Sequence, residues 1–246
     1  MKKKVKKYFS SVGLKFPENE AELKAFNEIH DEYDHSLSEE DIDPNKILQK
    51  IKQEHTLAKK PTRIDYHKRT VLAAEIVFQL KDDVSLGHVK LQKLIFLCQN
   101  TSSMSLHTNF LKQAMGPYDP VLMRSIDHQF KKNKWFEYQP TGFIKYQPLK
   151  KCGGHQTWFK RYFENDLENI NYIIDLLRKA SMEQTELVGT IFACWLKGIQ
   201  ENTIISDEYL IKKVYGWHET KKEKYTRDQI ISATQWMKEK GIYPSK

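Results

Sequence analysis

The segment Met182–Gln200 constrains the fold of this chain more than any other feature. It carries six large apolar side chains at the three- and four-residue spacing of a helix. They are Leu187, Val188, Ile191, Phe192, Trp195 and Leu196. A helix this apolar needs cover from other elements, because its side chains are stable only away from water. We therefore expect Met182–Gln200 to be the most buried helix of the protein.

Further helices and one β-hairpin are predicted by local patterns. Asp119 as an N-cap and Pro120 at the first helical position predict the start of one helix. The aromatic and β-branched runs Trp135–Tyr138 and Phe143–Tyr146 flank a turn containing Gly142, which predicts a hairpin. The expected fold class is therefore mainly α with a small β-hairpin. Helical spacing also predicts helices over Asn19–Tyr33, from Pro44, and over Tyr66–Leu80, His88–Cys98, Lys160–Lys179, Asp207–Tyr215 and Thr226–Lys240.

Three segments are expected to be irregular. Thr56–Arg63 is a basic stretch with a proline and is typical of a linker. Gly116–Pro120 combines glycine and two prolines and predicts a turn. Trp217–Tyr225 is rich in charge and predicts a solvated loop.

The composition favours a globular protein of the cytoplasm. Of the 246 residues, 39% are hydrophobic and 29% charged, which is enough apolar material for a core. No apolar run approaches the roughly 18 residues of a membrane span. The basic start Met1–Lys7 is not followed by the apolar stretch of a secretory signal. Three widely spaced cysteines with no CxxC pair support neither a zinc ribbon nor a disulfide framework.

The residues that could carry chemistry favour a non-enzymatic protein. The chain has no GxxxxGK[ST], HExxH, GxSxG or GxGxxG pattern, so no catalytic residue and no cofactor is predicted. The histidines, among them His88 and His155, are scattered and are expected at the surface rather than on a metal. Cys98 and Cys194 lie on apolar helical faces and are expected in the core. The Asp82-Asp83 doublet is expected to be a solvated loop charge.

Charge divides the chain into three parts. Residues 1–64 carry a net +1 and are expected to form a separate helical arm, which is partly mobile or packed on a partner. Residues 65–150 carry a net +5 and contain the most organised pattern. Residues 151–246 carry a net +2 and are expected to form a helical unit packed on the middle one. A nucleic-acid-binding face is therefore expected in 65–150, where the basic excess is concentrated.

The middle part has the element order of a winged helix. Three short helices precede the hairpin, so the third helix, Asp119–Lys132, is the candidate for the major groove and Trp135–Tyr146 is the candidate wing. The segment Gln99–Met115 between the second and third helices is longer than a simple turn, which weakens this interpretation. The residues expected to contact double-stranded DNA are basic or neutral donors, namely Arg124, His128, Lys131, Lys132, Lys134 and, on the wing, Lys145.

The same lysines have an ordinary structural explanation. Lysines gather at the C-terminal end of a helix because they interact favourably with its dipole and extend their charge into water. Lys131, Lys132 and Lys134, next to Trp135, fit this explanation as well as they fit phosphate contacts with a stacked aromatic ring.

Two clusters in the middle part are recognisable. One is Gly87–Phe96, which reads GHVKLQKLIF, and the other is Gly116–Pro120, which reads GPYDP. Together they resemble the SocA-like, or Panacea, domain of phage-associated and antitoxin proteins. The closer resemblance is to a variant with GxVKLQKL and GPYD that is associated with proteins labelled as type I restriction-modification specificity subunits. The resemblance extends over residues 66–246, and its C-terminal cluster consists of Trp217, His218, Lys221, Tyr225, Ile230, Ala233, Gly241 and Pro244.

The resemblance implies a role in bacterial or phage defence without a catalytic residue. A complete specificity subunit needs two target-recognition domains separated by long helices, and this chain is too short for them. We therefore expect an accessory or detached DNA-binding protein of a restriction-modification system. The alternative is an antitoxin or adaptor that binds a protein partner, such as a toxin or a methyltransferase, rather than DNA.

Overall fold

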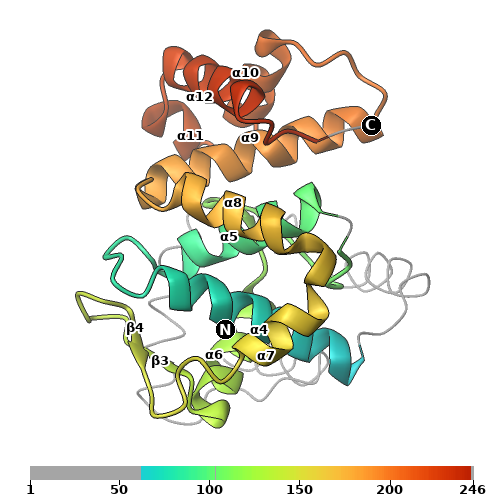
Figure 1. The fold of residues 1–246 in the computed structure, drawn as a ribbon. Helices are drawn as coiled ribbons and strands as arrows, with labels where there is room; N and C mark the ends of the chain where they lie inside the picture. The colour runs from blue at the N-terminus through green and yellow to red at the C-terminus, as the bar shows by residue number, and fades with distance from the viewer. Residues whose placement is uncertain (1–61, 103, 245–246) are drawn as a thin grey trace, which may run out of the picture. The chain divides into compact units, whose positions relative to one another are not determined.

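The computed structural model describes residues 62–102 and 104–244, which lie in one compact unit, Lys60–Lys246. The unit is mainly helical, as the sequence predicts (Figure 1), and it contains two small antiparallel strand pairs where one hairpin was predicted. The elements are α4 (Arg63–Gln79), α5 (His88–Thr101), β1 (Leu111–Gln113), β2 (Gly116–Tyr118), α6 (Pro120–Asn133), β3 (Phe136–Tyr138), β4 (Tyr146–Pro148), α7 (Gln156–Tyr162), η1 (Glu164–Asp166), α8 (Leu167–Leu177), α9 (Met182–Gln200), α10 (Asp207–Tyr215), α11 (Thr220–Lys224) and α12 (Arg227–Glu239).

Helix α9 spans the predicted segment and is buried on most of its surface. It begins at a capping box, in which Ser181 and Gln184 bond to each other's backbone N–H groups. It packs against α5 on one side and against α10 and α12 on the other (Figure 1). The rings of Phe96 on α5 and Phe192 on α9 lie edge to face, with centroids 5.8 Å apart. The expectation that 182–200 is the most buried helix holds by number among the described helices, with 11 buried residues of 19, but not by fraction, because α5 buries 9 of its 14 residues.

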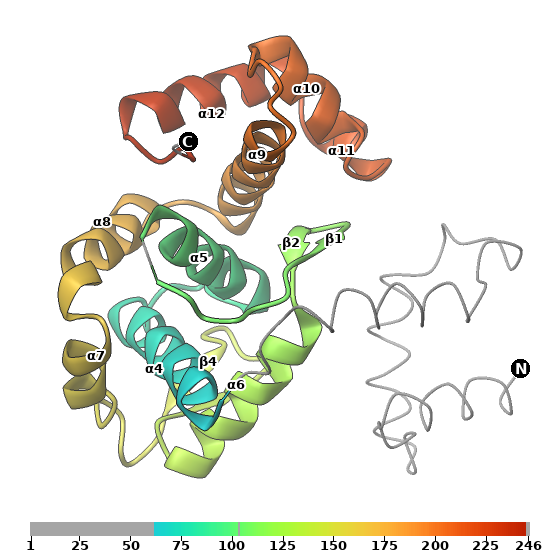
Figure 2. The same cartoon turned by 90° about the vertical axis from the view of Figure 1, so that its right-hand side faces the viewer.

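Helix α4 is the central element of the part of the unit that also contains α6 and α7. It lies between α6 and α7, and it also contacts α5 (Figure 2). Its residues from Arg69 to Val77 are all buried. It begins at a second capping box, formed by Thr62 and Asp65, so its start lies within the stretch 56–63 that was predicted as a linker. That prediction is wrong for Thr62 and Arg63.

The hairpin exists, and its second strand begins later than predicted. Strands β3 and β4 pair in antiparallel register, with Phe136 opposite Pro148 and Tyr138 opposite Tyr146. Residues 139–145 therefore form the connecting loop. A further pair, β1 and β2, was not predicted, because Gly116 was assigned to a turn. Gly116 has a φ of 84° and follows the tight turn, so the strand begins where a turn was expected.

Two predictions in the C-terminal part are wrong. One helix was expected over 160–179, but the structure has α7, the 3₁₀ turn η1 and then α8. The interruption falls at Asn165 and Asp166, which favour caps and turns over helix interiors. Residues 220–224, expected in a solvated loop, form the short helix α11, and its Lys221 is fully buried.

Some expectations concern residues outside the described ranges. The helices predicted over Asn19–Tyr33 and from Pro44, and the arm 1–64 up to residue 61, fall there and stay predictions. Across residues 62–102 and 104–244, no helix is long and apolar enough to cross a membrane.

Candidate nucleic-acid-binding surface

Helix α6 presents one face to solvent. The Asp119 side chain caps it by accepting a hydrogen bond of 2.9 Å from the Leu122 backbone N–H, and Pro120 occupies the first helical position. The residues that face the core are Leu122, Met123, Ile126 and Phe130. Arg124, His128 and Lys131 follow one another at helical spacing on the opposite, exposed face.

Helix α6 ends in a sharp reversal at Lys134. This residue has a φ of 59° in the left-handed region, and its backbone N–H donates to the carbonyls of Phe130 and Lys131. The reversal directs the chain into β3 and leaves the Lys134 side chain exposed. The lysines at the end of α6 therefore stand at the junction of the helix and the hairpin.

The structure brings five of the six predicted DNA contacts to the exposed side of α6 and its end. Arg124, His128, Lys131, Lys132 and Lys134 are all exposed. Lys131 already forms an ion pair of 2.6 Å with Glu137 on β3. Across the described ranges, no ion pair involves Arg124, Lys132 or Lys134. Lys145 differs: it is half-buried, and its ammonium donates to the Pro140 carbonyl within the hairpin loop.

Trp135 cannot serve as a stacking platform for a base. Its indole is 6% exposed and packs against the rings of His67 and His155. The aromatic part of the predicted lysine–tryptophan surface is therefore core.

His88 fastens the hairpin to α6, a role that no sequence pattern indicated. Its ring stacks on Tyr138 of β3 at a centroid distance of 3.7 Å, and its Nε2 lies 2.8 Å from Asp127 on α6. The surface role expected for this histidine is therefore only partly correct, because the side chain is half-buried and joins three elements. This contact and the Lys131–Glu137 pair fix the direction of the hairpin relative to α6.

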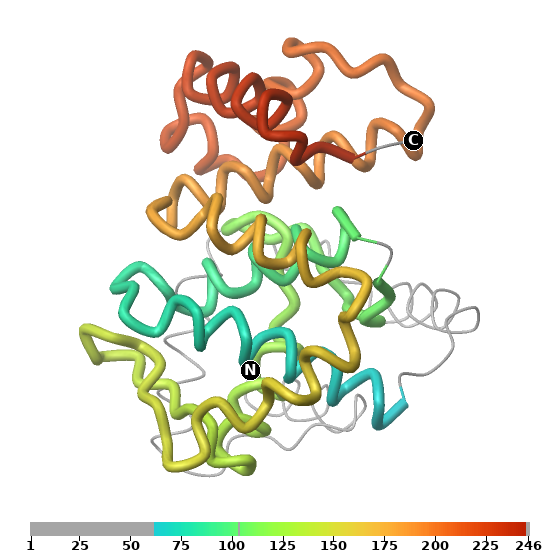
Figure 3. Tube along the Cα trace, viewed as in Figure 1, coloured from blue at the N-terminus to red at the C-terminus, as the bar shows by residue number. Residues whose placement is uncertain are grey.

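The basic stretch of the sequence continues past the hairpin. Residues 128–163 contain eight Lys and Arg residues and one acidic residue, Glu137, which gives a net +7 of the chain's +8. The chain runs from the hairpin directly into α7 (Figure 3). The Lys151 backbone N–H donates to the Lys134 carbonyl at 2.8 Å, so these two exposed lysines are neighbours. Lys151, Lys160 and Arg161 belong to the same basic stretch and lie outside the part 65–150 to which the basic excess was assigned from the sequence.

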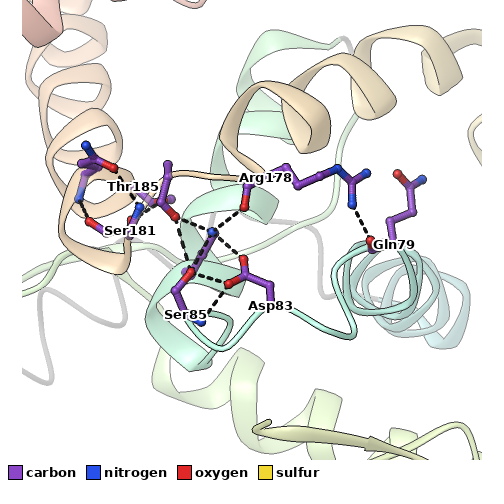
Figure 4. Close-up of polar contacts among 9 residues, drawn as sticks. Gln79, Asp83, Ser85, Arg178, Ser181 and Thr185 are labelled. Atoms are coloured by element: carbon purple, nitrogen blue, oxygen red, sulfur yellow. Dashed lines mark hydrogen bonds and ion pairs between the residues drawn. The ribbon is translucent and has the colours of Figure 1, made fainter. Parts of the chain in front are cut away.

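The lysines of the recognisable GHVKLQKLIF cluster point inward, in contrast to those of α6. Lys90 is fully buried. Its ammonium donates to Asp83 at 2.7 Å, to Ser85 at 2.9 Å and to the carbonyls of Arg178 and Ala180. Figure 4 shows how Asp83 and Ser85 face the end of α8 at Arg178. Asp83, expected to be a solvated charge, is therefore part of an internal network.

Lys93 and Gln92 join the first recognisable cluster to the second. The fully buried Lys93 ammonium donates to the Pro117 carbonyl at 2.6 Å. The Gln92 side-chain amide bonds to both the N–H and the C=O of Asp119, at 2.7 and 3.0 Å. Burial, only partly offset by the charge of Glu186, lowers the pKa of Lys93 to about 7. The two clusters thus form one internal contact between α5 and the start of α6.

A second buried charge cluster surrounds Glu186 on α9. Its carboxylate accepts hydrogen bonds from Lys221, from Lys224 at 3.0 Å and from the Tyr225 hydroxyl at 3.0 Å. Burial alone would raise the pKa of Glu186, but the two lysines outweigh it and lower the pKa. Burial lowers the pKa of Lys221. The cluster fastens α11 to α9.

His155 is a further buried charge partner, contrary to the expected surface position. It is fully buried, and its Nε2 lies 2.9 Å from Glu75 on α4. Burial would raise the pKa of Glu75, but hydrogen bonds from His155 and Gln79 outweigh it and lower the pKa. Two predictions about cysteines are confirmed: Cys98 and Cys194 are buried, and burial raises the pKa of both thiols, that of Cys194 to about 12.

A cavity lies elsewhere, between α8–α9 and α11–α12. Its volume is about 840 Å³, and its lining mixes apolar side chains such as Leu187 and Trp236 with charged ones such as Glu183, Lys224 and Asp228. Among the residues that the structure describes, no group of three or more His, Cys, Asp or Glu side chains could hold a metal ion.

Comparisons of the chain with protein-family models, with curated proteins and with solved structures found no match.

Proposed function

We propose that this chain is a non-enzymatic protein that binds double-stranded DNA through α6, the β3–β4 hairpin and the segment that leads to α7. One observation carries the proposal: residues 128–163 hold a net +7 with a single acidic residue. Clustered Lys and Arg on one part of a domain attract phosphates and release their counterions. Surface lysines in soluble proteins are usually interspersed with acids, so this separation calls for a polyanionic partner.

In this proposal the parts of the surface have different roles. The exposed face of α6 enters the major groove, where Arg124 and His128 reach base edges. Lys132, Lys134 and Lys151 contact phosphates, which set the register without reading sequence. Lys131 exchanges its pairing with Glu137 for a phosphate.

The arrangement departs from a simple winged helix in one respect. The β1–β2 pair stands between α5 and α6, where a short turn joins the two helices of a helix-turn-helix. In this chain, α6 is instead held at its start by Gln92 and at its side by α4. A rigidly held helix can still be presented to a groove, because Arg124 and His128 on its outer face are exposed.

The resemblance to the SocA-like, or Panacea, domain supports a setting in bacterial or phage defence. Its residues in GHVKLQKLIF and GPYDP lie mostly inside the protein, so the resemblance bears on how the chain folds rather than on what it binds. We propose an accessory DNA-binding protein of a restriction-modification system, acting in the cytoplasm, as the form of this role.

Fluorescence anisotropy with a labelled 20-base-pair duplex tests the DNA proposal. Micromolar binding that weakens steeply between 50 and 200 mM salt is expected, together with its loss in a Lys131→Glu, Lys132→Glu, Lys134→Glu variant. A Lys212→Glu, Lys222→Glu, Lys240→Glu variant changes the net charge equally at exposed positions outside the surface. An equal loss of DNA affinity in both variants would show that net charge, and not this surface, determines binding. Absence of binding at low salt would refute the proposal.

A protein partner is the second candidate, and the cavity of about 840 Å³ favours it. A groove between helices with apolar side chains in its lining is a common docking site for the apolar face of a partner helix. An antitoxin or adaptor would then bind a toxin or methyltransferase with little dependence on salt. Co-expression with the products of neighbouring genes, followed by size-exclusion chromatography in high salt, tests this candidate.

A further inference from the structure

The loop of the hairpin presents a phenylalanine to solvent. The Phe143 side chain is 81% exposed, the highest exposed fraction of any aromatic side chain in the described part of the chain. Phenylalanine side chains normally bury most of their apolar surface, because water contact is unfavourable. Phe143 therefore stands where apolar surface is available for a ligand.

The loop is built to hold that position. The Gln139 backbone N–H donates to the Lys145 carbonyl at 2.7 Å, and the Gly142 N–H donates to the Gln139 carbonyl at 3.1 Å. The Lys145 ammonium closes the loop by bonding to the Pro140 carbonyl. A Cβ at Gly142 would lie 2.9 Å from the Ile144 carbonyl oxygen, so this close turn requires glycine.

The loop is also fixed relative to α6. Tyr138, at the end of β3, stacks on His88, and His88 bonds to Asp127 of α6. The stacking of Tyr138 on His88 and the bond from His88 to Asp127 therefore hold the loop of Phe143 against the helix that is proposed to enter the major groove. No acidic residue lies in the loop, and Glu137 on β3 is already paired with Lys131.

An exposed phenylalanine on a fixed, basic loop is the arrangement of a wedge, which is an apolar side chain that inserts between stacked bases. Proteins that bend or unstack DNA insert exposed apolar side chains, phenylalanine among them, between base steps. We propose that Phe143 inserts between adjacent base pairs of the bound duplex and unstacks them. The preferred ligand is then DNA with a weakly stacked step, such as a mismatch. This inference rests on the proposed DNA-binding function and specifies its substrate.

The alternative occupant for Phe143 is a pocket on a protein partner. The basic character of residues 128–163 favours DNA, because an exposed aromatic ring amid cations combines stacking with phosphate contacts. A protein partner would leave every DNA measurement on a Phe143 variant unchanged, and it is therefore one outcome of the test.

The experiment compares two 20-base-pair duplexes that differ only by a central T·T mismatch. Each is made with and without 2-aminopurine beside the central pair, because this base fluoresces more strongly when it is unstacked. We expect the full-length protein to bind the mismatched duplex about tenfold more tightly, since its step is easier to open. We also expect binding to raise 2-aminopurine fluorescence.

Phe143→Ala is the test variant, and Ile204→Ala is its matched control, because Ile204 is an equally exposed apolar side chain at 89% on the α9–α10 connection. Phe143→Ala should remove the mismatch preference and the fluorescence rise while leaving the salt dependence unchanged, since no charge is lost. Phe143→Trp should restore both signals, because the larger ring also stacks.

The outcomes separate the two proposals. Salt-dependent binding without mismatch preference, or a Phe143→Ala variant that behaves like Ile204→Ala, overturns the wedge and leaves the DNA proposal intact. The wedge is also overturned if Phe143→Ala binds both duplexes more weakly by the same factor and still raises 2-aminopurine fluorescence as the parent protein does. Absence of binding to either duplex at low salt overturns the DNA proposal itself.

Discussion

Lysines serve opposite purposes in two regions of this molecule. In the interior around α5 and α9, Lys90, Lys93 and Lys221 are fully buried and bond to carbonyls and carboxylates of the chain itself. Along residues 128–163, Lys132 and Lys134 are exposed, and within the described residues neither has an ion pair. The first set fastens distant segments to one another, whereas the second set is available to a partner.

The contrast teaches that a lysine-rich pattern has no fixed meaning. A buried ammonium loses its hydration and must recover it from several acceptors, so its location is decided by what surrounds it. An exposed ammonium keeps its hydration and contributes little to folding stability. Substitutions should therefore affect stability in the first region and ligand binding in the second.

The largest effect is expected from Glu186→Ala. It leaves Lys221 buried without its carboxylate, which should lower the free energy of unfolding by about 3–5 kcal/mol in urea denaturation. Glu183→Ala, at an exposed neighbouring carboxylate, should cost less than about 1 kcal/mol. The double variant Glu186→Leu, Lys221→Met should be closer to the parent, because it removes both charges. Equal costs for the two alanine variants would contradict the buried cluster.

Gln92→Ala should cost about 1–3 kcal/mol, because it leaves the backbone N–H of the buried Asp119 without a partner and leaves its carbonyl only the long bond of 3.4 Å from the Met123 N–H. The control is Gln129→Ala on α6, whose side chain makes no hydrogen bond to the described residues and should change stability by less than about 1 kcal/mol. Denaturation in urea measures both. A cost no larger than that of the control would show that the two recognisable clusters do not depend on this amide.

The lowered pKa of Lys93 predicts an unusual dependence of the free energy of unfolding on pH. Its pKa is about 7 in the folded protein, against about 10.4 in an unfolded chain. Between pH 7 and 9 the unfolded chain therefore binds more protons, so stability should rise with pH, by at most about 1.4 kcal/mol per unit. Unfolding at pH 7, 8 and 9 checks this rise, and Lys93→Met should flatten it. Parallel curves for the two proteins would contradict the lowered pKa.

The smallest effect distinguishes two adjacent surface lysines. Lys132→Ala should reduce the slope of log K against log salt for DNA binding by about 0.9. Lys131→Ala should reduce it less, because this lysine already shares its charge with Glu137. Both should leave the free energy of unfolding within about 0.5 kcal/mol of the parent. A larger slope change in Lys131→Ala than in Lys132→Ala would reverse the assignment.

Local signals account for what the sequence predicted well. The helix over Met182–Gln200 follows from its apolar spacing, the start of α10 follows from Ser206 as an N-cap, and the start of α6 follows from Asp119-Pro120. These signals act over three or four residues, so they can be read without knowing the fold. The hairpin was also within reach, because its turn residues and aromatic runs are contiguous.

Long-range contacts account for what the sequence could not show. The burial of Lys90 and Lys93 depends on the carbonyls of Ala180 and Pro117, which are distant in the sequence. The burial of Lys221 depends on its bond to Glu186, which lies 35 residues away, and the burial of His155 depends on its contact with Glu75. In the candidate surface, five of the six predicted residues are exposed. Lys145 is the exception, because its ammonium donates to the carbonyl of Pro140 in its own loop.

The Lys90 network has a practical consequence for dividing this protein into fragments. Two of the acceptors of its ammonium, at Arg178 and Ala180, lie far beyond the hairpin, and the partner of Glu75 is His155. A fragment ending at residue 150 would retain Lys90 and Glu75 but lose these groups, so the buried ammonium would keep only Asp83 and Ser85 and the buried carboxylate only Gln79. Expression of such a fragment should yield aggregates, whereas residues 62–244 contain every partner of both charges.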